Sequence, residues 1–164
     1  MVVRPAKAGD APELARMRLA LQEHMQTSNS RLLPMSRQAI SNLAERYRSH
    51  LEDPNRQILV VEDRSGILIG MAMGTVAERD DLHPSRCGRI DDVWIKPEHR
   101  RQRLGKRLIG DLLAFFERKE VATLVLNYSV GNVEAEGTWK ALGFEPILTV
   151  AVARPSELRQ KLEK

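Results

Sequence analysis

Apolar residues recur every three or four positions in four stretches of this 164-residue chain, the spacing that gives a helix one buried face. The stretches are residues 14–25, 40–51, 104–116 and 133–142. Asp10 precedes the first stretch and Pro12 stands in its first turn, so we expect Asp10 to cap this helix. The second helix should end before the Asp53-Pro54 dipeptide, because a residue before proline disfavours helical geometry.

Runs rich in β-branched and other apolar residues predict six strands beside these helices. They cover residues 2–4, 58–62, 67–76, 89–95, 122–128 and 144–153, and the turn at 63–66 favours a hairpin. The element order is β-α-α-β-β-β-α-β-α-β, which predicts an α/β (α+β) fold with a mixed sheet flanked by helices. We expect one domain over residues 1–164, with 155–164 as an exposed C-terminal tail that forms a short helix.

The segment 90–108, IDDVWIKPEHRRQRLGKRL, joins a predicted strand to a predicted helix through a strongly basic turn. The first amides of a helix lack intrahelical partners and lie at the positive end of its dipole, so they attract anions. The guanidinium groups of this turn favour a polyphosphate over a single carboxylate. A solvent-exposed basic turn without a ligand is the competing interpretation. A Walker-type phosphate loop is excluded, because Arg107 follows Gly105-Lys106 and no glycine stands at the required distance upstream.

Composition and charge are those of a globular protein that attracts anions. Hydrophobic residues make up 42% and charged residues 29%, as in globular domains, and the 4% aromatic content leaves the core to aliphatic side chains. The net charge of +4 and pI near 9.5 indicate attraction to nucleotides, anionic cofactors or nucleic acid. The single cysteine, Cys87, excludes an internal disulfide and favours a reducing compartment. Without a signal-peptide core or a bilayer-length apolar run, a cytoplasmic protein with no membrane contact is expected.

Two motifs in this element order resemble the GNAT superfamily of acetyl-CoA-dependent N-acyltransferases. The basic turn is similar to the family's pyrophosphate motif, Gln/Arg-x-x-Gly-x-Gly/Ala, which falls on Arg100, Arg103 and Gly105. The segment 132–144 is similar to the family's Asn-x-x-Ala-x-x-x-Tyr-x-x-x-Gly-Phe helix, with Trp139 at the tyrosine position. The resemblance covers nearly the whole chain. It implies a mostly antiparallel sheet, acetyl-CoA as cosubstrate, no metal, and acetyl transfer to an amine acceptor.

The resemblance also implies which residues hold acetyl-CoA. The strand before the basic turn would bind the pantetheine arm, the turn and helix start would bind the phosphates, and the later helix would flank the arm. The implied cofactor-binding residues are Val93, Trp94, Ile95, Arg100, Arg101, Gln102, Arg103, Leu104, Gly105, Lys106, Asn132 and Trp139. Arg103 replaces the family's usual glycine. The indole of Trp139 cannot supply the proton that the family's tyrosine gives to the departing thiolate.

The candidate groups for proton transfer lie on the predicted strand 89–95 and at the end of the predicted strand 122–128. Asp91 and Asp92 are adjacent, so an unbroken strand would direct them to opposite faces of the sheet. Acidic residues are common in this strand of the family, which makes Asp92 the preferred catalytic base. Tyr128 is the catalytic candidate for the acid in place of Trp139, and Ser129 can orient or relay a proton. The structural alternatives are an ion pair for Asp92 and core packing for Tyr128 and Trp139.

Other functional classes have weaker support. A nucleic-acid-binding module would use the basic turn, but its basic residues are confined to one loop and aromatic platforms are few. A catalytically silent acyl-CoA sensor would account for Trp139. Cys87 lacks a legible His and Asn arrangement for nucleophilic catalysis, and with His83 it offers only two zinc ligands. The glycines at every fourth position from 66 to 74 indicate strand bending or the close approach of a bulky group.

The identity of the acceptor amine is not legible in the sequence. The resemblance implies which segments border the acceptor pocket, and these carry the acidic residues Glu23, Glu78, Asp80 and Asp81 together with the basic residues Arg31, Arg37 and Arg154. The acidic side chains favour a cationic amine, such as an aminoglycoside, a polyamine or a lysine side chain, and a protein N-terminus is a further candidate. The oligomeric state stays open, with a homodimer as one option.

Overall fold

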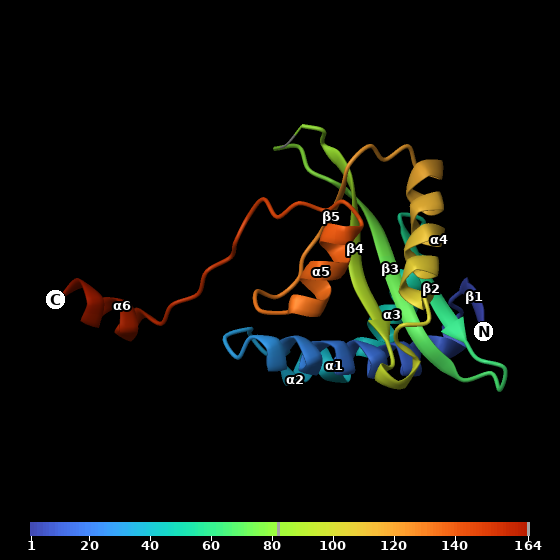
Figure 1. Cartoon of the computed structure of the whole chain (residues 1–164), viewed down its shortest axis with the longest axis horizontal. Helices are drawn as coiled ribbons and strands as arrows, with labels where there is room; N and C mark the ends of the chain where they lie inside the picture. Colours follow the sequence, from blue (N-terminus) through green and yellow to red (C-terminus); the bar gives the residue numbers. More distant parts are fainter. Residues whose placement is uncertain (82, 164) are drawn as a thin grey trace.

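The computed structural model describes residues 1–81 and 83–163, and its centre is a five-stranded sheet (Figure 1). The strands lie side by side in chain order, and each neighbouring pair is antiparallel except β4 with β5, which is parallel. Their bounds are β1 Val2–Pro5, β2 Arg56–Glu62, β3 Leu68–Glu78, β4 Arg86–Ile95 and β5 Leu124–Leu126. The predicted mixed and mostly antiparallel sheet flanked by helices is confirmed.

Helices cover both faces of this sheet (Figure 1). The bounds are α1 Ala11–Ser28, α2 Arg37–Ser41, α3 Leu43–Glu52, α4 Leu104–Arg118, α5 Val133–Ala141 and α6 Pro155–Leu162, with 3-10 turns η1 Ala8–Asp10 and η2 Pro97–His99. α1 and α3 pack on one face and α4 packs on the other. The four predicted helices are present, although the second is divided at Asn42, and the tail helix is present as α6. No helix in the described ranges is long and apolar enough to cross a membrane.

The sheet divides the core into two clusters. Leu14 and Trp94 belong to the cluster under α1 and α3, and Phe116 belongs to the cluster under α4. Phe116 lies over glycines of β3 and β4: a Cβ atom would stand 2.7 Å from its ring at Gly74 and 2.7 Å from it at Gly88. The close approach of a bulky side chain, which was one of the two predicted explanations, therefore accounts for the glycine in the middle of β3.

The segment 144–153, predicted as a strand, has no regular structure. The apolar side chains after Phe144 are open to solvent, with Ile147 88% and Val150 89% exposed. A strand needs hydrogen bonds to a neighbour, and within the described part of the chain no backbone–backbone bond reaches residues 145–153. The predicted strand is therefore wrong for the single chain, because its β-branched composition meets no partner there.

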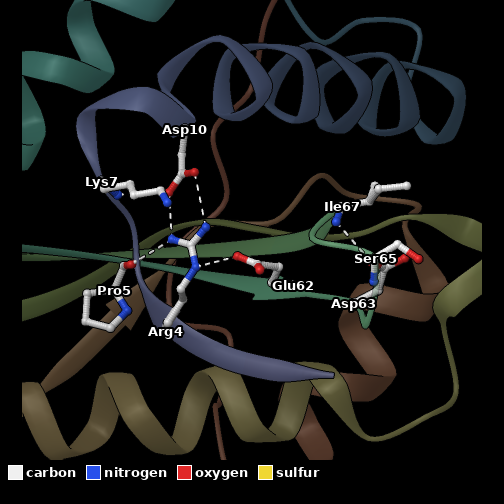
Figure 2. A network of polar contacts seen from close by, with 8 residues as sticks. All are labelled: Arg4, Pro5, Lys7, Asp10, Glu62, Asp63, Ser65 and Ile67. Atoms are coloured by element: carbon white, nitrogen blue, oxygen red, sulfur yellow. Dashed lines mark hydrogen bonds and ion pairs between the residues drawn. The ribbon is translucent and has the colours of Figure 1, made fainter.

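The turn between β2 and β3 forms the predicted hairpin. Asp63 Oδ1 accepts hydrogen bonds from the backbone amides of Ser65 at 2.8 Å and Ile67 at 2.9 Å (Figure 2). Gly66 has a φ of +80°, which glycine adopts without steric penalty. These turn residues hold β2 and β3 in antiparallel register.

Asp10 directly precedes α1, but its carboxylate does not cap that helix. It accepts hydrogen bonds from the Lys7 amide at 2.9 Å and from two guanidinium nitrogens of Arg4 at 2.8 and 3.2 Å (Figure 2). Arg4 Nε also donates to Glu62 on β2 at 2.6 Å. The predicted cap is wrong, because the charged donor Arg4 binds the Asp10 carboxylate more strongly than a neutral helix amide does. Asp10 thus joins β1 to the start of α1.

We expect Asp10→Asn to destabilise the protein at neutral pH and to reduce its sensitivity to acid. Burial alone would raise the pKa of Asp10, but hydrogen bonds from Arg4 and the Lys7 amide outweigh it and hold this pKa below the ordinary aspartate value. A carboxylate whose pKa is lowered by folding stabilises the fold above its unfolded pKa of about 3.9, and this contribution is lost as the pH falls. Urea unfolding at pH 7 should show a loss of about 2 kcal/mol.

The difference between Asp10→Asn and wild type should shrink as the pH falls below about 3.9 and through the lowered pKa of folded Asp10, because the wild-type carboxylate is then protonated. Asp111→Asn, on the exposed side of α4, is the control and should change stability by less than about 0.5 kcal/mol. A difference for Asp10→Asn that does not depend on pH would contradict the role of the ionised carboxylate.

Candidate functional site

A cavity opens where β4 and β5 separate. β5 pairs with β4 only as far as Ile90 and Leu126, so no strand of the described residues lies on that side of residues 91–95. The cavity has a volume of about 490 Å³, within the range of small-molecule sites, and is lined by parts of α1, β4, α4 and α5. β5 is shorter than the predicted strand 122–128, and the residues after it, 127–129, line the cavity instead.

A β-bulge in β4 places two adjacent carboxylates on the same face of the sheet. Asp91 and Asp92 stand opposite the single residue Met73 of β3, because the pairing register shifts there. The alternation of side chains resets at this point: Ile90 packs under α4, whereas Trp94, four residues later, packs under α1. Opposite faces were expected only for an unbroken strand, and the bulge breaks that condition, so both carboxylates share one face of the sheet.

Asp92 is held by donors from two helices. Arg18 of α1 places Nε 3.1 Å from Oδ1, and Tyr47 of α3 donates its hydroxyl to Oδ2 at 2.9 Å. The Asp92 side chain is 14% exposed and lines the cavity. Burial raises the pKa of Asp92, and this effect outweighs the charge of Arg18 and the hydrogen bond from Tyr47. A carboxylate with a raised pKa in a cavity wall is suited to accept a proton.

Asp91 also lines the cavity but is held by neighbours within the sheet. The hydroxyl of Thr75 on β3 donates to Oδ2, and Arg89 Nε donates to Oδ1. The side chain is 13% exposed, close to the value for Asp92. The two carboxylates are therefore equally buried but differ in partners, which makes Asp91 a matched comparison for Asp92.

The basic turn before α4 has a left-handed backbone at two arginines. Arg101 has a φ of +62° and Arg103 a φ of +60°, a region that glycine prefers. Arg103 immediately precedes α4, at the position where the resembling motif has glycine, and its side chain is exposed. The turn therefore keeps the glycine-like backbone despite the substitution. Among the residues described, the backbone amides of 102–106 have no backbone acceptor, so they remain open to an anion.

Arg100 differs from the other arginines of the turn because its side chain is half-buried, whereas theirs are exposed. Its Nε donates to the carbonyl of Ile95 at 3.1 Å, and its Nη1 donates to Glu134 of α5 at 3.3 Å. The guanidinium also lies 4.8 Å from the centre of the Trp94 ring. His24 of α1 meets the same ring edge-on, with 5.6 Å between ring centres. The sequence predicted Arg100 as a cofactor contact but gave no sign of Glu134 or His24.

The far wall of the cavity comes from α5 and the segment before it. Asn132 caps α5, since its Oδ1 accepts a hydrogen bond from the amide three residues later at 3.1 Å. Trp139 lines the cavity and packs edge-on against Phe144, with 5.7 Å between ring centres. Tyr128 and Ser129 also line it. Ser129 is buried, and its hydroxyl has no hydrogen-bond partner in the described part of the chain, which is rare for a buried polar atom.

Most of the predicted site residues therefore meet at one cavity. Asp92 and Tyr128 line it together with ten predicted cofactor-binding residues: Val93, Trp94, Ile95, Arg100, Arg101, Arg103, Leu104, Gly105, Asn132 and Trp139. Gln102 and Lys106 lie outside it, exposed on the turn and the first turn of α4. Arg18 was missed, because its place beside β4 follows from helix packing and not from a local pattern.

Residues 20–144 match the model of the acetyltransferase (GNAT) family. Over 100 residues the chain is 33% identical to a provisionally named ribosomal protein bS18-alanine N-acetyltransferase of Bacillus subtilis (strain 168). This match spans 61% of the chain and 61% of the length of that relative.

Solved structures share the fold at low sequence identity. The crystal structure of a mutant protein from Bacillus halodurans has a TM-score of 0.80 at 15% identity, covering 94% of this chain and 99% of that one. A predicted acetyltransferase from Clostridium acetobutylicum, solved with acetyl-CoA, has a TM-score of 0.76 at 14% identity, covering 95% and 97%. These structures establish the likeness of fold, and the family model covers most of the sequence. The chain therefore belongs to the acetyltransferase (GNAT) family.

Proposed function

We propose that this protein transfers the acetyl group of acetyl-CoA to a primary amine, which attacks the thioester directly. The observation that carries the proposal is the bulge of β4, which brings Asp92 to the wall of a cavity that reaches the basic turn. The reaction needs a base for the amine and an anion-binding surface for the donor, and this cavity offers both. Membership of the acetyltransferase family supports the same activity.

The residues present fit acetyl-CoA at three points. The open amides of 102–106 suit the pyrophosphate, and the exposed side chains of Arg101 and Lys106 suit the 3′-phosphate. The edge of β4 over residues 93–95, which has no strand beside it, offers backbone groups to the two amides of pantetheine. The unpaired hydroxyl of Ser129 offers one further polar contact. When bound, acetyl-CoA supplies an activated acyl group.

The helix α5 would form the opposite side of the cofactor site. Asn132 and Trp139 both line the cavity from this helix and its cap, so they suit the predicted role beside the slender pantetheine arm. Arg100 is less suited to the 3′-phosphate than its neighbours, because its guanidinium already contacts Glu134 and Trp94. Its proposed role is to hold β4 and α5 together around the arm.

Asp92 is proposed as the base, because an amine must be neutral when it attacks. As the new N–C bond forms and the C–S bond breaks, a proton passes from the amine nitrogen to the Asp92 carboxylate. Arg18 and Tyr47 hold that carboxylate in place. The departing thiolate takes a proton from the Tyr128 hydroxyl, with Ser129 as the residue that orients the transfer. Exchange with solvent then restores both groups.

The acceptor side of the cavity favours a cationic amine. Asp91, Asp92 and Glu134 line it, whereas the acidic residues that the sequence suggested at positions 23, 78, 80 and 81 are not among its lining residues. The Bacillus subtilis relative is named for an alanine of ribosomal protein bS18. A peptide with a free N-terminal alanine is therefore the first acceptor to test, followed by lysine peptides, polyamines and aminoglycosides.

Calorimetric titration with acetyl-CoA followed by detection of released thiol tests the proposed function. Micromolar binding and thiol release that requires an added amine are the expected results. Binding without turnover on any amine would favour an acyl-CoA sensor. Salt-sensitive nucleic-acid binding that persists at saturating CoA, with no affinity for acetyl-CoA, would favour the nucleic-acid module and contradict the proposal.

The double variant Arg101→Ala with Lys106→Ala should bind acetyl-CoA about tenfold more weakly, a change of ~1.4 kcal/mol, because two cations near the 3′-phosphate are lost. Dephospho-CoA lacks that phosphate, so its affinity should change far less in the same titration. Arg118→Ala, at the far end of α4, is the control for the general loss of positive charge. Equal losses for the two ligands would remove the 3′-phosphate assignment.

A further inference from the structure

Three polar side chains form a row along α1. Arg18, Gln22 and Gln26 stand four residues apart, the spacing at which side chains on a helix are neighbours. Gln22 is only 8% exposed, although glutamine is a residue type that mostly lies at the surface. A buried amide is costly unless its polar atoms are hydrogen-bonded, so the contacts of Gln22 explain its position.

Both ends of the Gln22 amide have partners, and the partners lie on different segments. Nε2 donates to the carbonyl of Leu33, in the loop after α1, at 3.1 Å, and Oε1 accepts from Nη1 of Arg18 at 3.2 Å. These partners fix the orientation of the amide, because the opposite orientation would place its NH2 group against the donors of the guanidinium. The loop therefore holds an acceptor in place for Arg18.

Arg18 benefits from such an acceptor because its side chain is long and borders the cavity. Holding an arginine side chain in one orientation costs conformational entropy. The Arg18 side chain is 22% exposed and lines the cavity, so water competes for its guanidinium. With Nη1 bonded to Gln22, Nε lies 3.1 Å from Oδ1 of Asp92. The contacts thus run from the loop through Gln22 and Arg18 to the carboxylate.

We propose that Gln22 is a positioning residue for acetyl transfer: it holds Arg18 against Asp92 and so keeps that carboxylate ionised and ready to accept the proton of the amine. Gln22 is not among the described residues that line the cavity, so it acts on the reaction only through Arg18. The inference rests on the proposed function, because it assumes that Asp92 is the base.

The groups that face Asp92 come from three elements and set the direction of the expected effect. Burial has the largest influence on the pKa of Asp92 and raises it, and the neighbouring Asp91 of β4 raises it as well. Arg18 of α1, and Tyr47 and Arg46 of α3, lower this pKa. Loss of the ordered Arg18 charge would therefore raise the pKa further, so the base would be protonated up to a higher pH.

Titration of the Asp92 carboxyl carbon by nuclear magnetic resonance tests the inference in the unliganded protein, without turnover. Gln22→Met keeps the length of the side chain but offers Arg18 no oxygen acceptor. Leu33 is exposed, so water can replace the donor that its carbonyl loses, and the variant should fold. The pKa of Asp92 should be higher in Gln22→Met than in wild type.

Gln26→Met is the matched control for this titration. Gln26 belongs to the same row, and its Nε2 donates to the carbonyl of Leu32 in the same loop at 3.4 Å. It stands eight residues beyond Arg18, about 12 Å along the helix, so it is too far away to hold the guanidinium. Gln26→Met should leave the titration of Asp92 unchanged.

The pH dependence of the rate carries the same test to the reaction. Gln22→Met should lower kcat about threefold on the acidic limb, and leave the plateau and the affinity for acetyl-CoA close to wild type. In the Arg18→Met background, Gln22→Met should have no further effect on the titration or on the limb, because the contact that Gln22 supports is then missing.

An unchanged titration of Asp92 in Gln22→Met would overturn the inference. An equal shift in Gln26→Met, or a shift that persists in the Arg18→Met background, would overturn it too, because the effect would then not pass through Arg18. Failure of the proposed function would show in a different variant, as an acidic limb that remains in Asp92→Asn. That result would remove the role of Gln22 in the reaction, whereas the titration would still report its contact with Arg18.

Discussion

Replacement of Asp92 by asparagine is expected to lower kcat for acetyl transfer by about a hundredfold, the lower end of what a general base contributes. Asparagine has nearly the same shape and can still accept the hydrogen bond from Tyr47, but it cannot take a proton. The affinity for acetyl-CoA should stay close to wild type, because the proposed phosphate contacts lie in the basic turn. Thiol release at saturating acetyl-CoA measures the first quantity, and calorimetric titration measures the second.

The dependence of the rate on pH gives an independent test of the same assignment. A base must be deprotonated to act, so the rate falls as the pH falls through its pKa. Because burial raises the pKa of Asp92, this acidic limb should lie above the ordinary aspartate value of about 3.9. The limb should be absent from the residual activity of Asp92→Asn, whereas a merely structural role for Asp92 would leave it in place.

Asp91→Asn is the matched control for this experiment. Asp91 stands in the same bulge and is buried to the same extent, but Thr75 and Arg89 hold it within the sheet. We expect this variant to keep most of the activity. Similar losses for the two variants would show that the bulge geometry, and not proton transfer by Asp92, accounts for the effect. Full activity in Asp92→Asn would place the base elsewhere.

The layers of the fold could be predicted because each depends on a local pattern. The apolar stripes of 14–25 and 104–116 fixed which side of α1 and α4 faces the sheet, and Leu14 and Phe116 are indeed buried. The hairpin at 63–66 followed from turn residues whose conformations are set locally. Local patterns of this kind extend over a few residues, so they identify elements and their buried faces well.

The detailed geometry of the site depends on contacts between distant segments. The bulge at Asp91 and Asp92 follows from the pairing of β4 with β3, and nothing in the sequence of β4 alone announces it. Tyr47 falls in the apolar stripe predicted over 40–51, which is correct for its ring, but its hydroxyl reaches Asp92 only because α3 packs against α1 and β2 on the same face of the sheet. The contact of Arg18 also joins distant segments, since its partner Asp92 lies 74 positions later in the chain.

The segment 144–153 was predicted as a strand but has no regular structure. Its residue types do favour a strand, but a strand also needs a partner with free hydrogen-bonding groups. Within one chain the partner is absent from the described residues, and the segment stays irregular. A sequence pattern reports what a segment favours, and the arrangement of the whole molecule decides whether that preference is met.

Phe116→Ala is expected to lower the free energy of unfolding by about 3–5 kcal/mol, among the largest single-residue effects on stability in this chain. Phe116 is 1% exposed and is the largest of the fully buried side chains. It covers the glycines of β3 and β4, which have no side chains of their own to fill the space left behind. Urea unfolding followed by circular dichroism measures the loss. Leu113→Ala, on the solvent side of the same helix at 44% exposure, should cost less than about 1 kcal/mol.

The contact between Phe116 and Gly74 can be separated from the general loss of burial by a double-mutant cycle. A Cβ atom at Gly74 would lie 2.7 Å from the Phe116 ring, so Gly74→Ala should destabilise the wild-type protein by overpacking, by about 1–3 kcal/mol. In the Phe116→Ala background the ring is gone, and the nearest remaining atom to the added methyl group is Leu112 Cδ2 at 3.2 Å. Gly74→Ala should therefore cost less there or even stabilise, which gives a coupling energy between the two sites. Additive effects would mean that the ring moves aside freely, and that the glycine is needed for the backbone of β3 and not for the approach of Phe116.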